Sequence, residues 1–233
     1  MSSTLNAFGQ PVGLPLPGWR PPPAPPRTPM AGRYCRLEPI DERFAGDLQA
    51  AASEDSDGRT WTYLPYGPFA TEGDYRRWLV ATCLGDDPLF FAVVDTASGT
   101  AVGQAAYLNI KPGQGSIEVG HLHFSPRLQR TRAATEAMYL MMRRAFEIGY
   151  RRYEWKCDAL NVPSRTAAER LGFSYEGVFR QATVNKGRNR DTAWYAAIDS
   201  EWPVLAAAFE AWLDPSNFDA AGRQRAGLQA RRV

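Results

Sequence analysis

The sequence predicts a mixed α/β fold in which helices flank a mostly antiparallel central sheet. Three observations predict it: short apolar segments separated by turn residues, one long amphipathic helix, and a strand–helix–strand order in the second half. The 233 residues are enough for one well-buried domain, and 44% hydrophobic and 12% aromatic residues are typical of a globular protein.

The first 32 residues are predicted to form an extended arm outside the core. Nine of the 18 prolines fall within the first 30 residues, most densely at 21–26, and such a composition cannot build a core. Leu14, Leu16 and Trp19 are apolar anchors that could hold the arm on its own domain or on a neighbouring subunit, and a loosely packed tail is equally compatible.

The segment from Arg33 to Phe124 predicts two helices and a strand meander. Asp41 and Thr71 have the chemistry of N-terminal helix caps, so we expect one helix to about Ala52 and another after Thr71. Turn residues separate the apolar runs that predict strands. These strands are expected at 34–37, 89–94, 102–110 and 117–124.

The second half predicts a long helix and then a strand, a helix and a hairpin. Ala134, Met138, Met141 and Ala145 recur at helical spacing, which indicates an amphipathic helix laid on a sheet over 131–148. The remaining elements are expected as a strand at 152–157, a helix at 163–171, hairpin strands at 176–184 and 190–198, and a last helix at 202–213.

Composition excludes several classes of protein and restricts the compartment. The three cysteines are odd in number and scattered, which argues against a disulfide framework or a metal site and favours a reducing cytoplasm. No apolar run approaches the roughly 18 residues of a membrane span, and the N-terminus lacks a secretory pattern. A net charge of +2 is too small to argue for nucleic acid. The tail at 215–233, with four arginines after Asn217, is predicted to be a solvated helix end or a contact for an anionic partner.

Two sequence motifs stand in the second half of the chain, at 128–137 and 161–173. They are followed in the same order by Glu176-Gly177 and Arg190-Asp191. With these motifs the chain resembles the GNAT superfamily of acyl-CoA-dependent N-acetyltransferases, in the branch of the RimJ and RimL ribosomal-protein acetyltransferases. The resemblance spans about 33–214 and leaves the arm and the basic tail outside. It implies a sheet splayed between its fourth and fifth strands, with acetyl-CoA bound in the opening.

The family's pyrophosphate loop carries glycines where this chain has Arg130 and Arg132. Glycine lets a backbone approach a phosphate closely, whereas arginine supplies a cationic fork. Backbone amides at the helix start still favour an anion, so we expect coenzyme A to bind in a changed cradle. The residues that the resemblance assigns to the coenzyme are His123, Phe124, Gln129, Arg130, Thr131, Arg132, Ala133, Ala134, Asn161 and Ser164.

Acetyl transfer to an amine needs a polarised thioester, a base and a proton for the departing sulfur. Glu118 is our first candidate for the base, with a solvent-facing strand glutamate as the alternative; Asp158 is second, and could instead be only a turn residue. His121 or His123 could also accept a proton. The family's frequent tyrosine, seven positions after Asn161, is Ala168 here. Ser164 is therefore assigned the role of proton donor or orienting hydroxyl, although it or Asn161 could simply cap a helix.

The acceptor is expected between the early helices, against Trp61, Tyr63, Tyr66 and Tyr107, although core packing explains these aromatic residues equally. Nothing in the sequence identifies the amine: a protein N-terminus, an amino sugar and a small polyamine all stay open. We expect direct attack, because no cysteine or serine occupies a nucleophile turn. A catalytically weak acyl-CoA-binding protein and an RNA-associated module are the alternatives, and a homodimer is left open.

Overall fold

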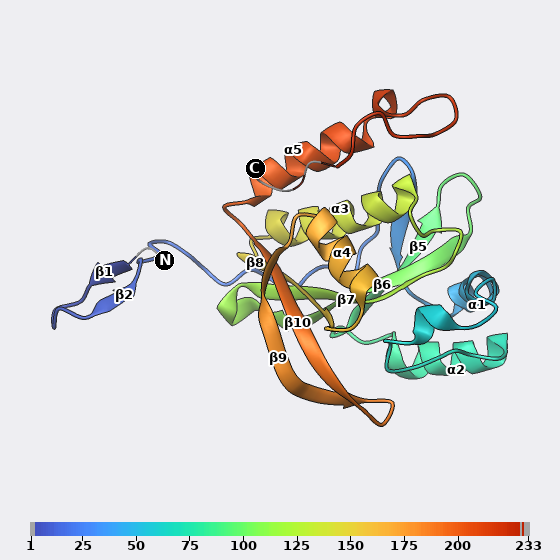
Figure 1. The fold of residues 1–233 in the computed structure, drawn as a ribbon, viewed down its shortest axis with the longest axis horizontal. Coiled ribbons are helices and arrows are strands. Elements are labelled where there is room, and N and C mark those ends of the chain that lie inside the picture. The colour runs from blue at the N-terminus through green and yellow to red at the C-terminus, as the bar shows by residue number, and fades with distance from the viewer. Residues whose placement is uncertain (1–2, 229, 231–233) are drawn as a thin grey trace.

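The computed structural model describes residues 3–228 and 230. Eight strands form one twisted sheet in the order β3-β4-β5-β6-β7-β8-β10-β9 (Figure 1). All neighbouring strands of this sheet are antiparallel except β7 and β8, which are parallel because α3 connects them. This arrangement confirms the predicted mixed, mostly antiparallel sheet flanked by helices.

The first half has the predicted order of elements, and both predicted caps are present. Asp41 Oδ1 accepts a hydrogen bond from the amide of Arg43 at 2.9 Å, and Thr71 Oγ1 accepts one from the amide of Asp74 at 3.1 Å. The elements are β4 (Cys35–Pro39), the 3-10 helix η1 (Glu42–Phe44), α1 (Ala45–Ala52), η2 (Arg59–Trp61), α2 (Glu72–Thr82), β5 (Leu89–Asp95), β6 (Ala101–Lys111), η3 (Pro112–Gln114) and β7 (Ser116–Phe124).

The second half also follows the prediction, with boundaries that differ by a few residues at most. The elements are α3 (Arg132–Glu147), β8 (Arg152–Asp158), α4 (Val162–Arg170), β9 (Ser174–Asn185), β10 (Arg188–Ile198), α5 (Trp202–Leu213) and the 3-10 helix η4 (Pro215–Asn217). In Figure 1, α3, α4 and α5 lie on one face of the sheet, and α1 and α2 lie on the other. The main core lies under α3 and α4, and a smaller core lies under α1 and α2.

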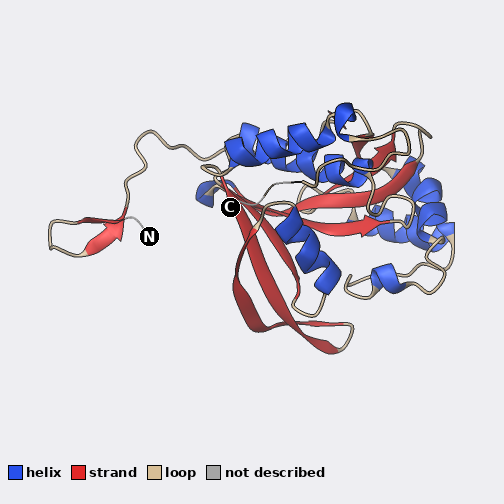
Figure 2. Cartoon of the chain, turned by 45° about the horizontal axis from the view of Figure 1, so that its top comes forward, coloured by secondary structure: helices blue, strands red, loops and turns tan. Residues whose placement is uncertain are grey.

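The N-terminal arm divides into a part that packs on the domain and a hairpin that does not. Trp19 lies against Gly115 and over Arg151, and Arg144 donates to the carbonyl oxygens of Thr28 and Pro29 at 2.6 and 2.7 Å. Before this anchored part, β1 (Ser3–Leu5) and β2 (Pro11–Gly13) form a hairpin that the sequence did not predict. Figures 1 and 2 show the hairpin standing away from the body, whereas β3 (Met30–Ala31) joins the sheet.

The basic tail does not continue the last helix, contrary to the prediction of a solvated helix end. After η4 the chain folds back, and Gln224 accepts a hydrogen bond from Trp212 Nε1 at 2.8 Å. Arg223 pairs with Asp219 at 2.9 Å, while Arg231 and Arg232 lie outside the described residues. Across the part of the chain that is described, no helix has both the length and the apolar character needed to cross a bilayer.

Candidate active site

β7 and β8 separate within the sheet and leave an opening between them. Their parallel pairing ends at Val119 and Trp155, although both strands continue beyond these residues. These are the fourth and fifth of the predicted strands, at 117–124 and 152–157, between which the resemblance implied a splay. Backbone groups on the β8-facing edge of β7 therefore have no strand partner along its last residues.

A β-bulge in β7 explains why the strands part. In the register of β6 and β7, the two residues His121 and Leu122 lie opposite Ala105 alone, and His121 has a left-handed φ of 51°. An extra residue bends a strand and strengthens its twist, so β7 turns away from β8 at this point. The opening is therefore built into the backbone of β7.

The turn between β7 and α3 presents unpaired backbone amides at the end of this opening. No acceptor among the described residues meets the amides of Arg130, Arg132 and Ala133. The next amide, of Ala134, is capped by Thr131 Oγ1 at 3.1 Å. Together with the dipole of a 16-residue helix, three free amides form a site that favours an anion.

Arg130 keeps the backbone conformation of the glycine that the family's loop has at this position. Its φ is 61°, in the left-handed region that costs a non-glycine residue about 1–2 kcal/mol. Gln129 stabilises the same turn, because its Nε2 donates to the carbonyl oxygen of Phe124 at 2.8 Å. The arginine thus replaces the glycine without changing the turn that glycine usually allows.

Arg132 is engaged by aromatic rings and is not extended towards the turn. Its guanidinium lies 4.9 Å from the ring centroid of Tyr34 and 4.6 Å from that of Phe218, which comes from the folded-back tail. Such cation–π contacts hold an arginine in place. The Arg132 side chain therefore contacts the tail, and only the backbone amide of Arg132 is left unpaired at the turn.

Glu118, our first candidate for the base, is buried beside the opening. Its Oε2 accepts hydrogen bonds from Asn109 Nδ2 at 2.8 Å and from Lys156 Nζ at 2.7 Å. Its Oε1 points towards Gly120, the residue where the strands part. Burial raises the pKa of the Glu118 carboxyl, while Lys156 and Asn109 partly oppose this shift. A solvent-facing glutamate is therefore excluded.

Lys156 connects Glu118 to the neighbouring strands. Its Nζ also lies 2.8 Å from the carboxylate of Glu154 and 4.0 Å from the ring centroid of Trp194 on β10. The three charged side chains are at least four-fifths buried, so solvent screens their interaction weakly. Glu154 also pairs with Arg152 at 2.7 Å, so the two carboxylates are balanced by two cations next to the opening.

On the other face of β8, two polar residues begin α4. Asn161 caps the helix, since its Oδ1 accepts from the amide of Ser164 at 3.1 Å, as one alternative predicted. Ser164 Oγ accepts from Trp155 Nε1 at 3.1 Å, and the Ser164 hydroxyl also lies within hydrogen-bonding reach of the Cys157 thiol. Asp158 accepts from the amide of Leu160 at 2.8 Å, which is the turn role considered for it.

The two histidines of β7 are packed against the loop that follows α1. His123 stacks on Trp61 with ring centroids 3.7 Å apart, and His121 Nδ1 lies 3.0 Å from the hydroxyl oxygen of Tyr66. Burial lowers the pKa of each imidazole to about 4. Both are therefore neutral and weakly basic near pH 7, which argues against either of them as the base. The side chain of His123 is occupied by Trp61, so only its backbone borders the opening.

The four predicted acceptor-binding aromatic residues do not lie together. Trp61, Tyr63 and Tyr66 share the loop over β7, and Tyr63 donates to the carbonyl oxygen of Leu160 at 3.3 Å. Tyr107 lies in the main core on the opposite face of the sheet, with its hydroxyl donating to the Met141 carbonyl at 2.6 Å. The prediction for Tyr107 is therefore wrong. Tyr107 has both polar and apolar neighbours along its strand. The sequence therefore could not show which face of the sheet its side chain occupies before the strand register was known.

The β9–β10 turn closes one end of the space in front of the opening. Lys186 Nζ donates to the carbonyl oxygens of Trp61 at 2.9 Å and Gly67 at 3.2 Å, and Asn185 Nδ2 donates to that of Tyr63 at 3.3 Å. The loop at 59–67 is thus tied to the β9–β10 turn.

Comparison with known proteins agrees with this geometry. The family model described as Acetyltransferase (GNAT) domain matches residues 36–174. The chain belongs to the GNAT acetyltransferase family. A crystal structure of a GCN5-related N-acetyltransferase from Brucella melitensis is 49% identical, has a TM-score of 0.90, and the match covers 92% of this chain and 98% of that one.

Two further relatives support the same family. A GNAT-family structure from Chromobacterium violaceum is 41% identical with a TM-score of 0.78, over 83% of this chain and 98% of that chain. The uncharacterized N-acetyltransferase YnaD of Bacillus subtilis is 27% identical over 67% of this chain and 90% of its own length. The protein is therefore an acetyltransferase of the GNAT type.

Sequence reasoning missed the residues that surround Glu118 in this GNAT domain. Asn109, Lys156 and Trp194 come from β6, β8 and β10, and none of them stands in the two motifs that resemble the family. The one available signal was the alternation of Glu154 and Lys156 along a strand, which places both on one face. Their meeting with Glu118 depends on the strand register.

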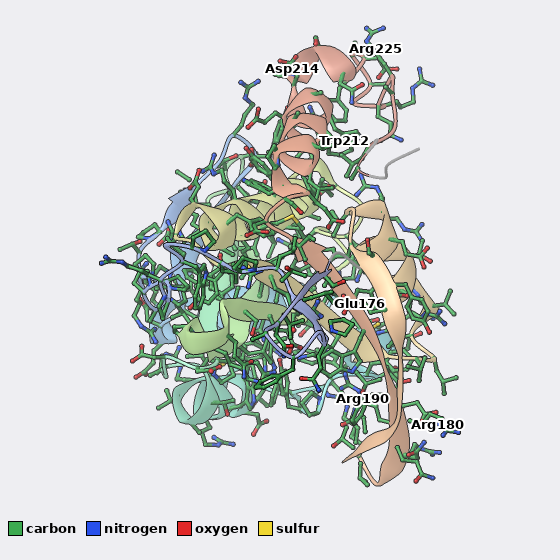
Figure 3. The ribbon with its side chains drawn as sticks, turned by 90° about the vertical axis from the view of Figure 1, so that its left-hand side faces the viewer. Glu176, Arg180, Arg190, Trp212, Asp214 and Arg225 are labelled. Atoms are coloured by element: carbon green, nitrogen blue, oxygen red, sulfur yellow. The ribbon has the colours of Figure 1, made fainter. Side chains whose placement is uncertain are left out.

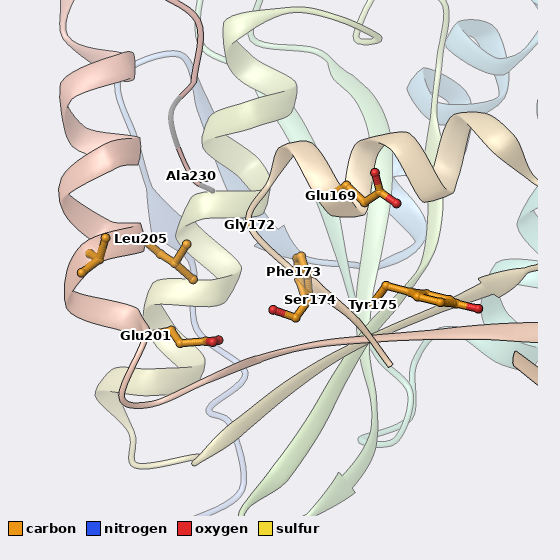
Figure 4. Close-up of a pocket in the computed structure, with 9 residues that line it drawn as sticks. Glu169, Gly172, Phe173, Ser174, Tyr175, Glu201, Leu205 and Ala230 are labelled. Carbon is orange, nitrogen blue, oxygen red and sulfur yellow. The ribbon is translucent and has the colours of Figure 1, made fainter. Parts of the chain in front are cut away.

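A separate cavity of about 330 Å³ lies at the far end of α4 (Figure 4). It is lined by the end of α4, the start of β9, α5 and Ala230. Ser164 lies at the other end of the helix, so this cavity is distinct from the opening between β7 and β8. We therefore do not assign it to the acetyl-transfer site.

Proposed function

We propose that this GNAT acetyltransferase uses acetyl-CoA and transfers the acetyl group by direct attack of a primary amine. The observation that carries the proposal is the opening between β7 and β8 that ends at the three free amides of Arg130, Arg132 and Ala133. An extended pantetheine chain fits between parted strands, and a diphosphate fits a helix start. The amides of the turn, together with the cationic side chain of Arg130, would hold the coenzyme's phosphates.

Two more distant fold neighbours bound coenzyme in their crystals. Microcin C7 self-immunity acetyltransferase MccE, at 17% identity, was solved with acetyl-CoA and AMP, and RimJ from Mycobacterium smegmatis, at 21%, with CoA-disulfide. A structural similarity at these low sequence identities supports the fold alone. The coenzyme and the RimJ/RimL branch therefore belong to the proposal, and the free amides of this chain are its main support.

Bound acetyl-CoA supplies the acetyl thioester, and the chain's own groups handle protons and charge. Glu118 takes a proton from the acceptor amine at Oε1, directly or through one water, because Oε2 is already bonded to Asn109 and Lys156. Unpartnered amides of β7 after Gly120 stabilise negative charge on the acetyl oxygen. Ser164 rotates its hydroxyl hydrogen from Cys157 to the departing sulfur.

Direct attack is favoured over a covalent enzyme intermediate by the state of Cys157, the cysteine on β8. This cysteine is buried, and burial raises the pKa of its thiol, which keeps it protonated and poorly nucleophilic. Cys35 and Cys83 are free and fully buried, so they are remote from any bound thioester. Three free cysteines also support a reducing compartment, such as the cytoplasm.

The acceptor is proposed to be a protein N-terminus or a small-molecule amine. Its route lies between the loop carrying Trp61, Tyr63 and Tyr66 and the strands carrying Glu118 and Trp194. Glu118 Oε1 accepts no hydrogen bond from the described residues, and it would meet the ammonium form of such an amine there.

A thiol-release assay with a panel of amines tests this function. The panel should hold short peptides with free N-termini, amino sugars and polyamines, and calorimetry should measure coenzyme affinity in parallel. We expect acetyl-CoA-dependent thiol release with at least one class of amine. Coenzyme binding without turnover on any amine would favour the catalytically weak acyl-CoA-binding alternative, and absence of both would overturn the proposal.

A further inference from the structure

The N-terminal hairpin is an apolar structure without a partner in its own chain. Its side chains are largely exposed, with Leu5 67%, Phe8 87% and Leu14 56% accessible, and residues 3–18 contain no charged side chain. A two-stranded hairpin is marginally stable by itself in water, and exposed apolar patches mark interaction sites. This hairpin therefore requires an uncharged apolar surface on another molecule.

The anchored part of the arm holds the hairpin away from its own domain. Trp19 is packed on Gly115 and Arg151, Pro22 and Pro25 are buried, and the chain before them leads outwards. Figures 1 and 2 both show the hairpin separated from the sheet and from every helix. The arm is thus presented to a neighbouring molecule.

The chain also carries a surface of matching chemistry on its edge strand, β9. Among the described strands, β10 is the one partner of β9, and Tyr175, Val178, Phe179 and Val184 are 49, 42, 62 and 74% exposed. Of the two charged side chains labelled along β9 in Figure 3, Glu176 is already paired with Arg152. An edge strand with exposed apolar residues on both faces accepts a further strand or hairpin by backbone pairing.

We propose that the protein is a homodimer in which the hairpin of each subunit docks on β9 of the other. One donor hairpin and one acceptor strand per chain allow a reciprocal, two-fold arrangement that closes at two subunits. A second copy suits the hairpin better than nucleic acid or an acidic protein, because residues 3–18 of the hairpin offer no charge to such partners.

The docking surface adjoins the acceptor side of the active site. The ring of Phe179 lies 6.1 Å from that of Trp194, and Trp194 in turn lies against Lys156, which pairs with Glu118. The partner's hairpin would therefore border the entrance that the acceptor uses. This consequence rests on the proposed function, whereas the dimer itself does not.

Site-specific crosslinking between differently tagged subunits tests the contact. One preparation carries Phe8→Cys and the other Phe179→Cys, and the mixture is treated with a short flexible bis-maleimide. The native cysteines at 35, 83 and 157 are buried and should not react with the crosslinker. The matched control pairs Phe8→Cys with Ala97→Cys, an exposed position in the turn between β5 and β6, strands that β7, β8 and β10 separate from β9. We expect crosslinked heterodimers from the first mixture and at least tenfold fewer from the control.

Sedimentation gives a second, independent measurement. The full chain should sediment as a dimer at micromolar concentration, and a variant beginning at Gly18, which keeps the anchored Trp19, should sediment as a monomer with unchanged melting temperature. A monomeric full chain, a dimer that survives the truncation, equal crosslinking in the control, or an intramolecular crosslink in the Phe8→Cys/Phe179→Cys double variant would each overturn the proposal. None of these measurements depends on acetyl transfer.

Discussion

At the scale of single residues, Glu118 and its partners decide how the site responds to pH. The pKa of the Glu118 carboxyl is raised by burial above its ordinary 4.5, and Lys156 opposes the rise. A base must be deprotonated, so activity should increase as pH rises through this pKa. Removing the lysine should move that increase to higher pH, because the opposing charge is lost.

Two variants test this role through the pH profile of kcat/KM. Glu118→Gln should lower kcat roughly 10²- to 10⁴-fold with coenzyme affinity unchanged. Lys156→Met should shift the acidic limb of the profile towards higher pH, which general destabilisation alone does not do. An unmoved limb in Lys156→Met, or full activity in Glu118→Gln across the profile, would remove Glu118 from the mechanism.

Arg130 permits a separate test of backbone conformation at the phosphate turn. Glycine adopts the observed φ of 61° freely, whereas alanine keeps the strain of arginine. Both substitutions remove the guanidinium. Arg130→Gly should therefore be about 1 kcal/mol more stable than Arg130→Ala in denaturant unfolding, with similar coenzyme affinities. A less stable glycine variant would contradict the left-handed turn.

At the scale of elements, the β9–β10 turn and the loop at 59–67 are joined by hydrogen bonds and form one wall of the proposed acceptor space. Lys186→Met removes two hydrogen bonds to carbonyl oxygens of the loop, which should let the loop move. The acceptor KM should rise roughly three- to tenfold, which corresponds to about 1 kcal/mol, while coenzyme affinity stays constant. Arg188→Met, at an exposed cation of the same hairpin, is the control. An equal rise of the acceptor KM in both variants would show that the hydrogen bonds of Lys186 to the loop do not shape the acceptor space.

At the scale of the whole molecule, the buried histidines should make the fold sensitive to acid. Their pKa values fall from an ordinary 6.5 to about 4 on folding, so their contribution to stability is complete above pH 6.5 and is lost as pH falls towards 4. Each pKa unit corresponds to about 1.4 kcal/mol for each histidine. The unfolding free energy should therefore decrease by a few kcal/mol across this range.

Denaturant unfolding between pH 7 and pH 4 measures this loss. The double variant His121→Gln/His123→Gln keeps polar side chains that do not titrate, so its free energy of unfolding should fall less steeply. Carboxylates contribute equally to both proteins and cancel in the comparison. Parallel curves for the wild type and the double variant would show that the histidines do not titrate on unfolding in this range.

Local patterns were sufficient for most elements of the fold. Leu205, Phe209 and Trp212 recur at helical spacing, and α5 occupies the predicted residues, while the caps at Asp41 and Thr71 begin helices as expected. The N-terminal hairpin was missed, because its proline- and glycine-rich residues carry no alternating pattern. The bulge in β7 was missed as well, since it depends on pairing with β6.

The sequence alone determined the element order, the family resemblance, and the candidates Glu118 and Ser164, because alternation, helical spacing and caps act between near neighbours in the chain. Only the tertiary structure decided that Lys156 and Asn109 meet Glu118, that Tyr107 lies in the core, and where β7 leaves β8. These contacts join segments separated by whole elements, and a shift of one residue in strand register would place each side chain on the opposite face.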